Sequence, residues 1–297
     1  MTPTEQLREV LKQQSIDPEG PEIAEMAMHK QAIERILYDS FGSTNLTIRY
    51  AGSRAKHTMI KAEYDLDIVA YFNHDSTIAG RTLKEIYWNV SNALRDSYEV
   101  TPNRSSLRLF SAAFSRAQYP LQIDVVPGKF QNNENYDCSL HQTTGDKDWL
   151  KTNLETHIDW IRQSNAREAL KLMKIARVTQ GLLIRQFPLD LIVIRVLRDK
   201  QHLPLADQFV HVLTEISTST VPIRVYDPAN SENDLSGLTA GPVWTDLALA
   251  CSRMLLANRS QDWLSILGDP SKFAPSSPAI IRAETDRTVA PIKPWAR

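Results

Sequence analysis

The chain lacks several features that would place it in a special class of protein. Its 297 residues include two cysteines, Cys138 and Cys251, which are too few and too far apart for the disulfide framework of a small secreted domain. No apolar run approaches the roughly 18 residues that mark a membrane span, and the polar residues 1–12 lack the hydrophobic segment of a signal peptide. We therefore expect a cytoplasmic protein with reduced thiols and no membrane contact.

The sequence also lacks an excess of either charge. It has 34 basic and 35 acidic residues, whereas proteins that hold nucleic acid by its phosphate backbone usually carry a basic excess. This balance argues against a long duplex as partner and requires any basic site to be local. A zinc site is also not favoured, because Cys138 and His141 are not followed by the second ligand pair that such a site needs.

The spacing of apolar residues divides the chain into a mixed part and a helical part. Helical periodicity appears at 3–14, 21–41 and 82–95. Alternating or continuous apolar runs predict strands at 46–51, 66–72, 98–101, 107–114 and 121–126, with Pro127 and Gly128 ending the sheet. Helical patterns then predominate, at 149–163, 166–185, 189–200, 205–217 and 243–257, with a long loop at 221–241.

The predicted fold class is therefore α+β, in two lobes. A core lobe with a mixed sheet and N-terminal helices spans 1–145, and a helical lobe packed against it spans 146–267. A Pro-rich tail, 268–297, is expected to wrap the surface or to stay partly disordered. The junction of two such lobes is a usual place for a ligand cleft.

Three acidic residues mark a candidate site in the core lobe. Asp65 and Asp67 open the strand at 66–72, where residues two apart point to the same face, and Asp124 lies between aliphatic residues of another strand. Carboxylates that share a buried face repel each other, and a divalent cation removes this cost. If the two strands are neighbours, we expect two magnesium ions there, about 3.5–4 Å apart, of the kind that assist an in-line displacement.

A glycine-serine pair follows the first strand and could hold phosphate. Gly52 allows the backbone to approach a phosphate closely, and the Ser53 hydroxyl can donate to a phosphate oxygen. Taken alone, the pair could be a plain turn with a helix cap, and the Asp65–Asp67 pair a solvated strand end. Their occurrence together, in this order and at predicted strand ends, favours a functional site.

These motifs resemble a known superfamily. The run 52–60, the Asp65–Asp67 pair and the segment 124–127 are similar to the nucleotidyltransferases related to DNA polymerase β. The branch they resemble contains cyclic GMP-AMP synthase, oligoadenylate synthase and the bacterial CD-NTases of anti-phage signalling. Residues 170–174 are similar to the phosphate-binding helix of that branch, and residues 227–230 to its late Asp-Pro loop. The resemblance covers about residues 20–260.

The resemblance implies a polymerase β-like lobe and a metal-dependent nucleotidyltransferase. Such an enzyme makes cyclic or short linear oligonucleotide second messengers from nucleoside triphosphates and releases pyrophosphate. Two Mg²⁺ or Mn²⁺ ions would be held by the catalytic residues Asp65, Asp67 and Asp124. Substrate contacts are implied for seven residues: Gly52, Ser53, Thr58, Lys171, Lys174, Gln186 and Phe187. Ser53 and Lys174 would contact the triphosphate, and Phe187 would stack on a nucleobase.

The helix at 166–185 supports part of this independently. Arg167, Lys171 and Lys174 are spaced to form one basic stripe beside an apolar one, as at the wall of a cleft, although a solvated surface face gives the same pattern. Three positions depart from the relatives. His57 replaces a frequent glycine and is expected to face solvent, Tyr64 replaces a small residue, and Gln186 replaces a phosphate-contacting serine.

Other functions remain open at this stage. A transferase of the same superfamily that tails tRNA or nucleotidylates a protein would use the same carboxylates on another acceptor. A non-catalytic nucleotide sensor would be indicated by loss of a carboxylate, and all three are present. The chain has no Cys/His-rich insertion, which together with its charge argues against activation by long double-stranded DNA. An effector or regulatory protein encoded in the same operon could dock on the Pro-rich tail.

Overall fold

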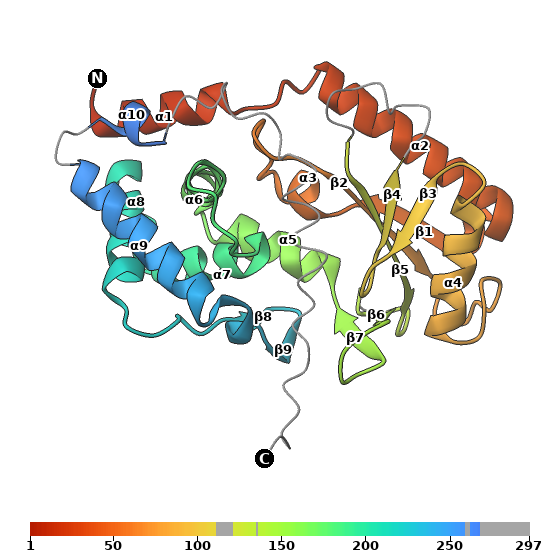
Figure 1. Ribbon diagram of the computed structural model, residues 1–297. Coiled ribbons are helices and arrows are strands. Elements are labelled where there is room, and N and C mark those ends of the chain that lie inside the picture. Colours follow the sequence, from red (N-terminus) through yellow and green to blue (C-terminus); the bar gives the residue numbers. More distant parts are fainter. Residues whose placement is uncertain (111–120, 135, 259–261, 268–297) are drawn as a thin grey trace, which may run out of the picture.

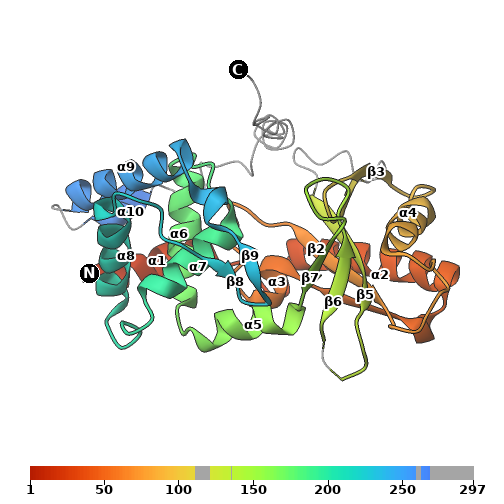
Figure 2. The same cartoon turned by 90° about the horizontal axis from the view of Figure 1, so that it is seen from below.

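The computed structural model describes residues 1–110, 121–134, 136–258 and 262–267. Figure 1 shows two lobes side by side, one built on a sheet and one built from helices. Figure 2, seen from below, places α3 (Gly52–Lys56) and α5 (Leu154–Gln163) between them. None of the described helices has the length and apolar character needed to cross a lipid bilayer. The mixed α+β fold agrees with the sequence prediction.

A seven-stranded mixed sheet forms the first lobe. Its main order is β1-β2-β5-β4-β3, and β6 and β7 extend it from β5. The strands are β1 (Leu46–Tyr50), β2 (Leu66–Phe72), β3 (Glu99–Pro102), β4 (Leu107–Phe110), β5 (Ile123–Phe130), β6 (Cys138–His141) and β7 (Trp149–Thr152). β2 and β5 are parallel neighbours, and the other pairs are antiparallel.

The two faces of this sheet are covered differently. Helices α2 (Pro21–Phe41) and α4 (Leu83–Leu94) pack on one face, where their apolar stripes share a core with Leu66, Ile68 and Val125. Intervening strand residues such as Val69 pack on the other face, in a smaller cluster that includes residues of α5. Because side chains alternate along a strand, Asp67 and Asp124 belong to this second face.

Two sequence predictions fail at the end of the sheet. β5 continues through Pro127 and Gly128 instead of ending there. Its ladder to β4 stops at Val125 and its ladder to β6 starts at Lys129. Pro127 therefore has a described neighbour only on the β2 side, and on its other side no described strand needs the N–H that it lacks. Residues 149–152 form β7, not the start of a helix, so the sheet extends beyond residue 145.

The second lobe is helical. It contains α5, α6 (Arg167–Thr179), α7 (Gln186–Val196), α8 (Leu205–Thr218), α9 (Pro242–Ala257) and α10 (Trp263–Leu267). The predicted long loop holds a short hairpin of β8 (Tyr226–Asp227) and β9 (Asn230–Asp234). Helix α1 (Pro3–Gln13) packs here, although the division by sequence counts it with the first lobe: Leu7, Val10 and Leu11 join the core of the helical lobe.

Several helix ends also differ from the prediction. α6 stops at Thr179, not at 185, because Gly181 adopts a left-handed φ of +62° that ends the helix. α7 begins at Gln186, three residues before its predicted start. The sequence did not predict α10. The predicted strand at 107–114 is described as far as Phe110, and the rest of it and the tail at 268–297 lie outside the described residues.

Candidate active site

The three acidic residues lie where two neighbouring strands meet. β2 and β5 pair in parallel register with Asp67 opposite Asp124, so the condition for a shared site, that the two strands are neighbours, is met. Asp65 directly precedes β2 and is two residues from Asp67. Asp65 and Asp67 are half-buried and Asp124 is buried. All three therefore lie at the same end of the strands, on the side of the sheet that faces α3 and α5.

Gly52 fits this site because it has no side chain. It begins α3 with a φ of +51°, and a Cβ at this position would lie 1.6 Å from the Oδ2 atom of Asp67. The Ala51 N–H donates to the Asp67 carbonyl oxygen at 2.9 Å and holds the turn against β2. The next residue, Ser53, has a buried hydroxyl without a hydrogen-bond partner among the described residues. A buried donor of this kind needs an acceptor.

Charge repulsion and burial perturb two of the carboxyl groups. Burial raises the pKa of Asp65, and Asp124 raises it further, while the Lys174 ammonium opposes the shift. The pKa of Asp67 is raised well above its ordinary value, first by burial and then by Asp65 and Asp124. The charged form of each group is thus destabilised, and protonation or a nearby cation would relieve this cost. Carboxylate oxygens are the type of ligand that a hard divalent ion takes.

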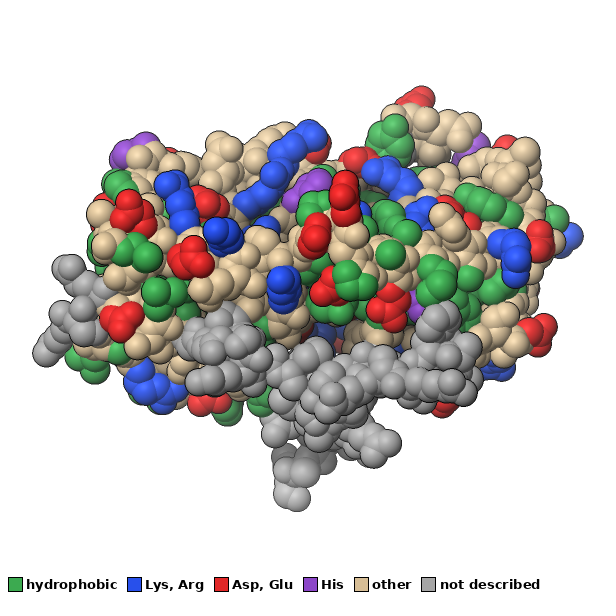
Figure 3. Space-filling view, turned by 90° about the horizontal axis from the view of Figure 1, so that it is seen from above, with side chains coloured by type: hydrophobic (Ala, Val, Ile, Leu, Met, Phe, Trp, Pro, Cys, Tyr) green, Lys and Arg blue, Asp and Glu red, His purple; other side chains and the backbone are tan. Residues whose placement is uncertain are grey.

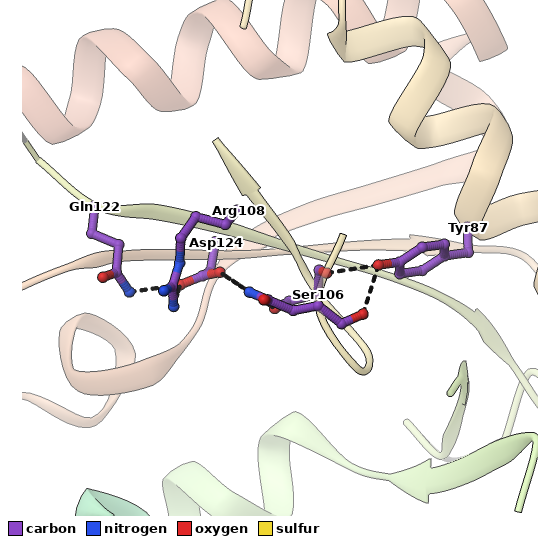
Figure 4. A network of polar contacts seen from close by, with 6 residues as sticks. Tyr87, Ser106, Arg108, Gln122 and Asp124 are labelled. Atoms are coloured by element: carbon purple, nitrogen blue, oxygen red, sulfur yellow. Dashed lines mark hydrogen bonds and ion pairs between the residues drawn. The ribbon is translucent and has the colours of Figure 1, made fainter. Parts of the chain in front are cut away.

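Asp124 is held by neighbours that the sequence did not reveal (Figure 4). Its Oδ2 atom accepts from Gln122 Nε2 at 2.9 Å and from Arg108 at 3.2 Å. Its Oδ1 atom accepts from Asn103 Nδ2 and Ser106 Oγ, both at 3.3 Å. Among the described side chains, no three acidic, histidine or cysteine groups are arranged to hold one ion. In this conformation the Asp124 carboxylate forms an ion pair with Arg108.

Lys174 projects from the helical lobe toward the carboxylates. Its side chain is buried, and its Nζ atom lies 3.8 Å from Glu63 Oε2. Arg177 pairs with the same Glu63 and donates from Nε to Gln186 Oε1 at 3.1 Å. Gln186 Nε2 in turn donates to the buried Asp190 at 2.6 Å. This network links α6 and α7 to the segment that leads into Asp65.

Phe187 lies at the start of α7 among polar partners. Lys56 Nζ stands 4.6 Å from the centre of its ring, and the His157 ring lies 4.9 Å from it. His157 Nε2 is 2.7 Å from Asp227 Oδ1. Asp227 also accepts from the N–H of Ala229 and from a side-chain amide of β9. The Asp-Pro loop thus fixes His157, which packs against Phe187.

Thr58 and Lys171 are the other two residues for which the resemblance implies a substrate contact. Thr58 is buried, and its N–H donates to the Ser53 carbonyl oxygen at 2.9 Å, so it supports the turn that carries Ser53. Lys171 lines a cavity with Arg167, about one helical turn from Lys174. His57 is exposed, as expected, with a left-handed φ of +57°. The sequence predictions missed Glu63 and Arg108, and neither stands in a recognisable motif.

A comparison with family models gives the class of protein to which the chain belongs. Residues 1–165 match the family model described as the Second Messenger Oligonucleotide or Dinucleotide Synthetase domain. Because the match takes in more than half of the 297 residues, the chain belongs to this family of nucleotidyltransferases, which synthesise cyclic oligonucleotide second messengers. The resemblance to the CD-NTases is thereby confirmed.

Solved structures share the fold at low sequence identity. The Bradyrhizobium diazoefficiens CD-NTase CdnG, in complex with GTP, has a TM-score of 0.68 and 13% identity over 95% of this chain and 98% of its own. Escherichia coli MS115-1 CdnC, in complex with a HORMA protein, has a TM-score of 0.62 and 15% identity over 91% and 94%. Vibrio cholerae DncV, a cyclic AMP-GMP synthase, has a TM-score of 0.59 and 14% identity over 81% and 76%. The search of curated proteins gives no match.

Proposed function

We propose that this protein is a divalent-metal-dependent synthase of cyclic or short linear oligonucleotide messengers that acts in anti-phage defence. The observation that carries the proposal is the contact between Gly52 and Asp67, together with the register that sets Asp67 opposite Asp124. It brings the Gly52–Ser53 turn and the paired carboxylates to one point. Triphosphate transfer requires this combination of an anion site and a cation site.

The residues divide into two groups in this proposal. Asp65, Asp67 and Asp124 would hold Mg²⁺ or Mn²⁺, with Asp124 exchanging its bond to Arg108 for the cation. Two bound ions would lower the pKa of the attacking ribose hydroxyl and stabilise the leaving pyrophosphate. The hydroxyl oxygen forms a bond to the α-phosphorus, and the bond from that phosphorus to the α–β bridging oxygen breaks. The hydroxyl proton goes to a nearby base or to solvent.

The remaining residues would bind and orient the nucleotide. The unpartnered Ser53 hydroxyl would donate to a phosphate oxygen, as would the buried Lys174 ammonium. Phe187 would stack on the base, and its packing against His157 would fix the plane of the ring. The Gln186 side chain is already hydrogen-bonded to Arg177 and Asp190. Its role would therefore be to hold α6 and α7 together beside the site.

The proposal is tested with purified protein, Mg²⁺ and labelled nucleoside triphosphates. Phosphatase-resistant labelled product, identified by mass spectrometry, is expected without any RNA or protein acceptor. Label found only on an added tRNA or protein would overturn the proposal in favour of a macromolecular acceptor. The double variant Asp65→Asn/Asp67→Asn should make no product, whereas Asp146→Asn, which removes a charge at an exposed position, should match the parent.

Partners and location follow from the same chemistry. Nucleoside triphosphates are the proposed substrates, and the cytoplasm is where a cell holds them. A regulatory protein is a reasonable second partner, because the Escherichia coli relative was solved with a HORMA protein. Co-purification of the full chain with the products of neighbouring genes would test this.

A further inference from the structure

A cavity of about 390 Å³ lies outside the carboxylate site. It is bounded by the last residues of α3, by one side of α5 and by the first turns of α6. Gly52, at the start of α3, meets Asp67, whereas Ala55, Lys56 and His57 at its end line the cavity. None of the three metal-site carboxylates lines it. Its volume is in the range of small-molecule sites.

The lining of this cavity is mainly cationic. Lys56, Arg162, Arg167 and Lys171 contribute four positive charges. The one acidic lining residue, Glu168, lies 3.8 Å from Arg8 of α1. Ala55 and Ile158 supply a small apolar wall. Like charges this close together repel, and an anion in the cavity would relieve the repulsion.

Two of these cations lack the partners that such groups normally have. The Nε atom of Arg167 is buried and has no hydrogen-bond partner among the described residues. Within the described part of the chain, no ion pair involves Arg167 or Lys171, whereas seven other residues of α5 and α6 take part in such pairs: Glu155, His157, Asp159, Arg162, Glu168, Lys174 and Arg177. Burial and the charge of Arg167 lower the pKa of Lys171. A buried unpaired guanidinium atom calls for an acceptor.

We propose that this cavity is a second anion site, which binds a compact polyanion with two or more phosphate or carboxylate groups. An extended nucleic acid is the less suitable occupant, because Figure 3 shows acidic and basic side chains interspersed on the upper face, with no broad field of one sign. A pocket of this size takes a small ligand, and its planar guanidinium groups favour bidentate binding of oxyanions.

The placement of the cavity connects it to the catalytic residues. α3 carries Ser53 at one end and Lys56 at the other, only three residues apart, and α6 carries both Lys171 and Lys174. A ligand held by Lys56 and Lys171 therefore contacts both α3 and α6, the two helices that carry the groups proposed to bind the substrate phosphates. We expect that an anion bound in the cavity also changes the rate of product formation.

The test is calorimetric titration of the full chain without metal or nucleotide. The probes are inorganic tripolyphosphate and citrate, which separate phosphate from carboxylate ligands. The double variant Arg162→Gln/Arg167→Gln should raise the Kd of the better probe about tenfold or more at roughly 0.1 M salt. The matched control Arg198→Gln removes one exposed guanidinium from the same lobe and should change the Kd by less than about threefold.

Lys174→Ala separates this cavity from the substrate site. Binding that survives Lys174→Ala and is lost in the double variant supports the proposal. Binding lost in Lys174→Ala and kept in the double variant assigns the probe to the substrate site and overturns it, as does equal loss in Arg198→Gln or no binding by either probe. The single variant Arg162→Gln, at a mostly exposed position, serves if the double variant unfolds in a thermal melt. Because no turnover is measured, failure of the proposed function would not affect the result.

Discussion

Replacing Gly52 by alanine tests how closely the turn proposed to bind phosphate must approach the carboxylates. The added Cβ would lie 1.6 Å from Asp67 Oδ2, whereas real Cβ contacts stay at or above 3.0 Å, so the two must separate by at least the difference of 1.4 Å. Displacing a catalytic group by about 1 Å costs on the order of 100-fold in rate. We therefore expect the rate of product formation by Gly52→Ala to fall at least about 100-fold.

A matched control separates this clash from simple backbone strain. Gly181→Ala also places alanine at a left-handed φ, +62° against +51°, but its Cβ would meet no atom within 4 Å. Both variants should lose about 1–2 kcal/mol of stability from the backbone conformation. Thermal melts and initial rates with labelled nucleotides measure the two effects. If Gly52→Ala kept the rate of the parent, or if Gly181→Ala lost as much activity, the close approach of Gly52 to Asp67 would not matter for function.

Three further variants probe the surrounding side chains. Lys174→Ala should raise the KM for nucleotide about tenfold or more, and an unchanged KM would remove this ammonium from the phosphate site. Arg108→Met should strengthen Mg²⁺ binding, measured by titration, because the cation no longer competes with a guanidinium for Asp124; weaker binding would contradict this. Asp227→Asn should cost about 1–3 kcal/mol at neutral pH, since it weakens the bond to His157. The pKa of Asp227 is lowered in the folded protein, so this contribution is present above its unfolded pKa and is lost as the pH falls through the folded one. Urea titrations of parent and variant should therefore converge in acid, and a constant difference would count against the pair.

The central strands were predictable because their apolar pattern leaves few alternatives. The run at 66–72 is nearly all apolar, as expected of a strand with both faces covered, and it forms β2 with the predicted bounds. Asp65, Asp67 and Asp124 stood out because charge is unusual in and beside such strands. The pairing of β2 with β5 sets Asp67 opposite Asp124, which is the arrangement that a shared face for the carboxylates requires.

Features that depend on pairing between distant segments could not be predicted in this way. Pro127 argued for a strand end, but its cost depends on whether a neighbour lies on both sides, which the sequence does not reveal. The residues 149–152 became a strand because β6 offered an edge to pair with. Arg108 reaches Asp124 through the register of β4 with β5. No periodicity within a single segment encodes such a contact.

The position of α1 has a consequence for how the molecule is assembled. Helix α1 contacts α6, α8 and α10, all of which follow the sheet in the sequence, and the Gln6 side chain accepts a hydrogen bond from the Trp263 N–H at 2.9 Å. During translation the apolar stripe of α1 is therefore fully covered only after these helices, which lie between residues 167 and 267, have been synthesised. Residues at the two ends of the described chain thus stabilise each other. Deletion of the first 13 residues should therefore destabilise the helical lobe and leave the sheet folded, because these residues are not part of the core of the sheet.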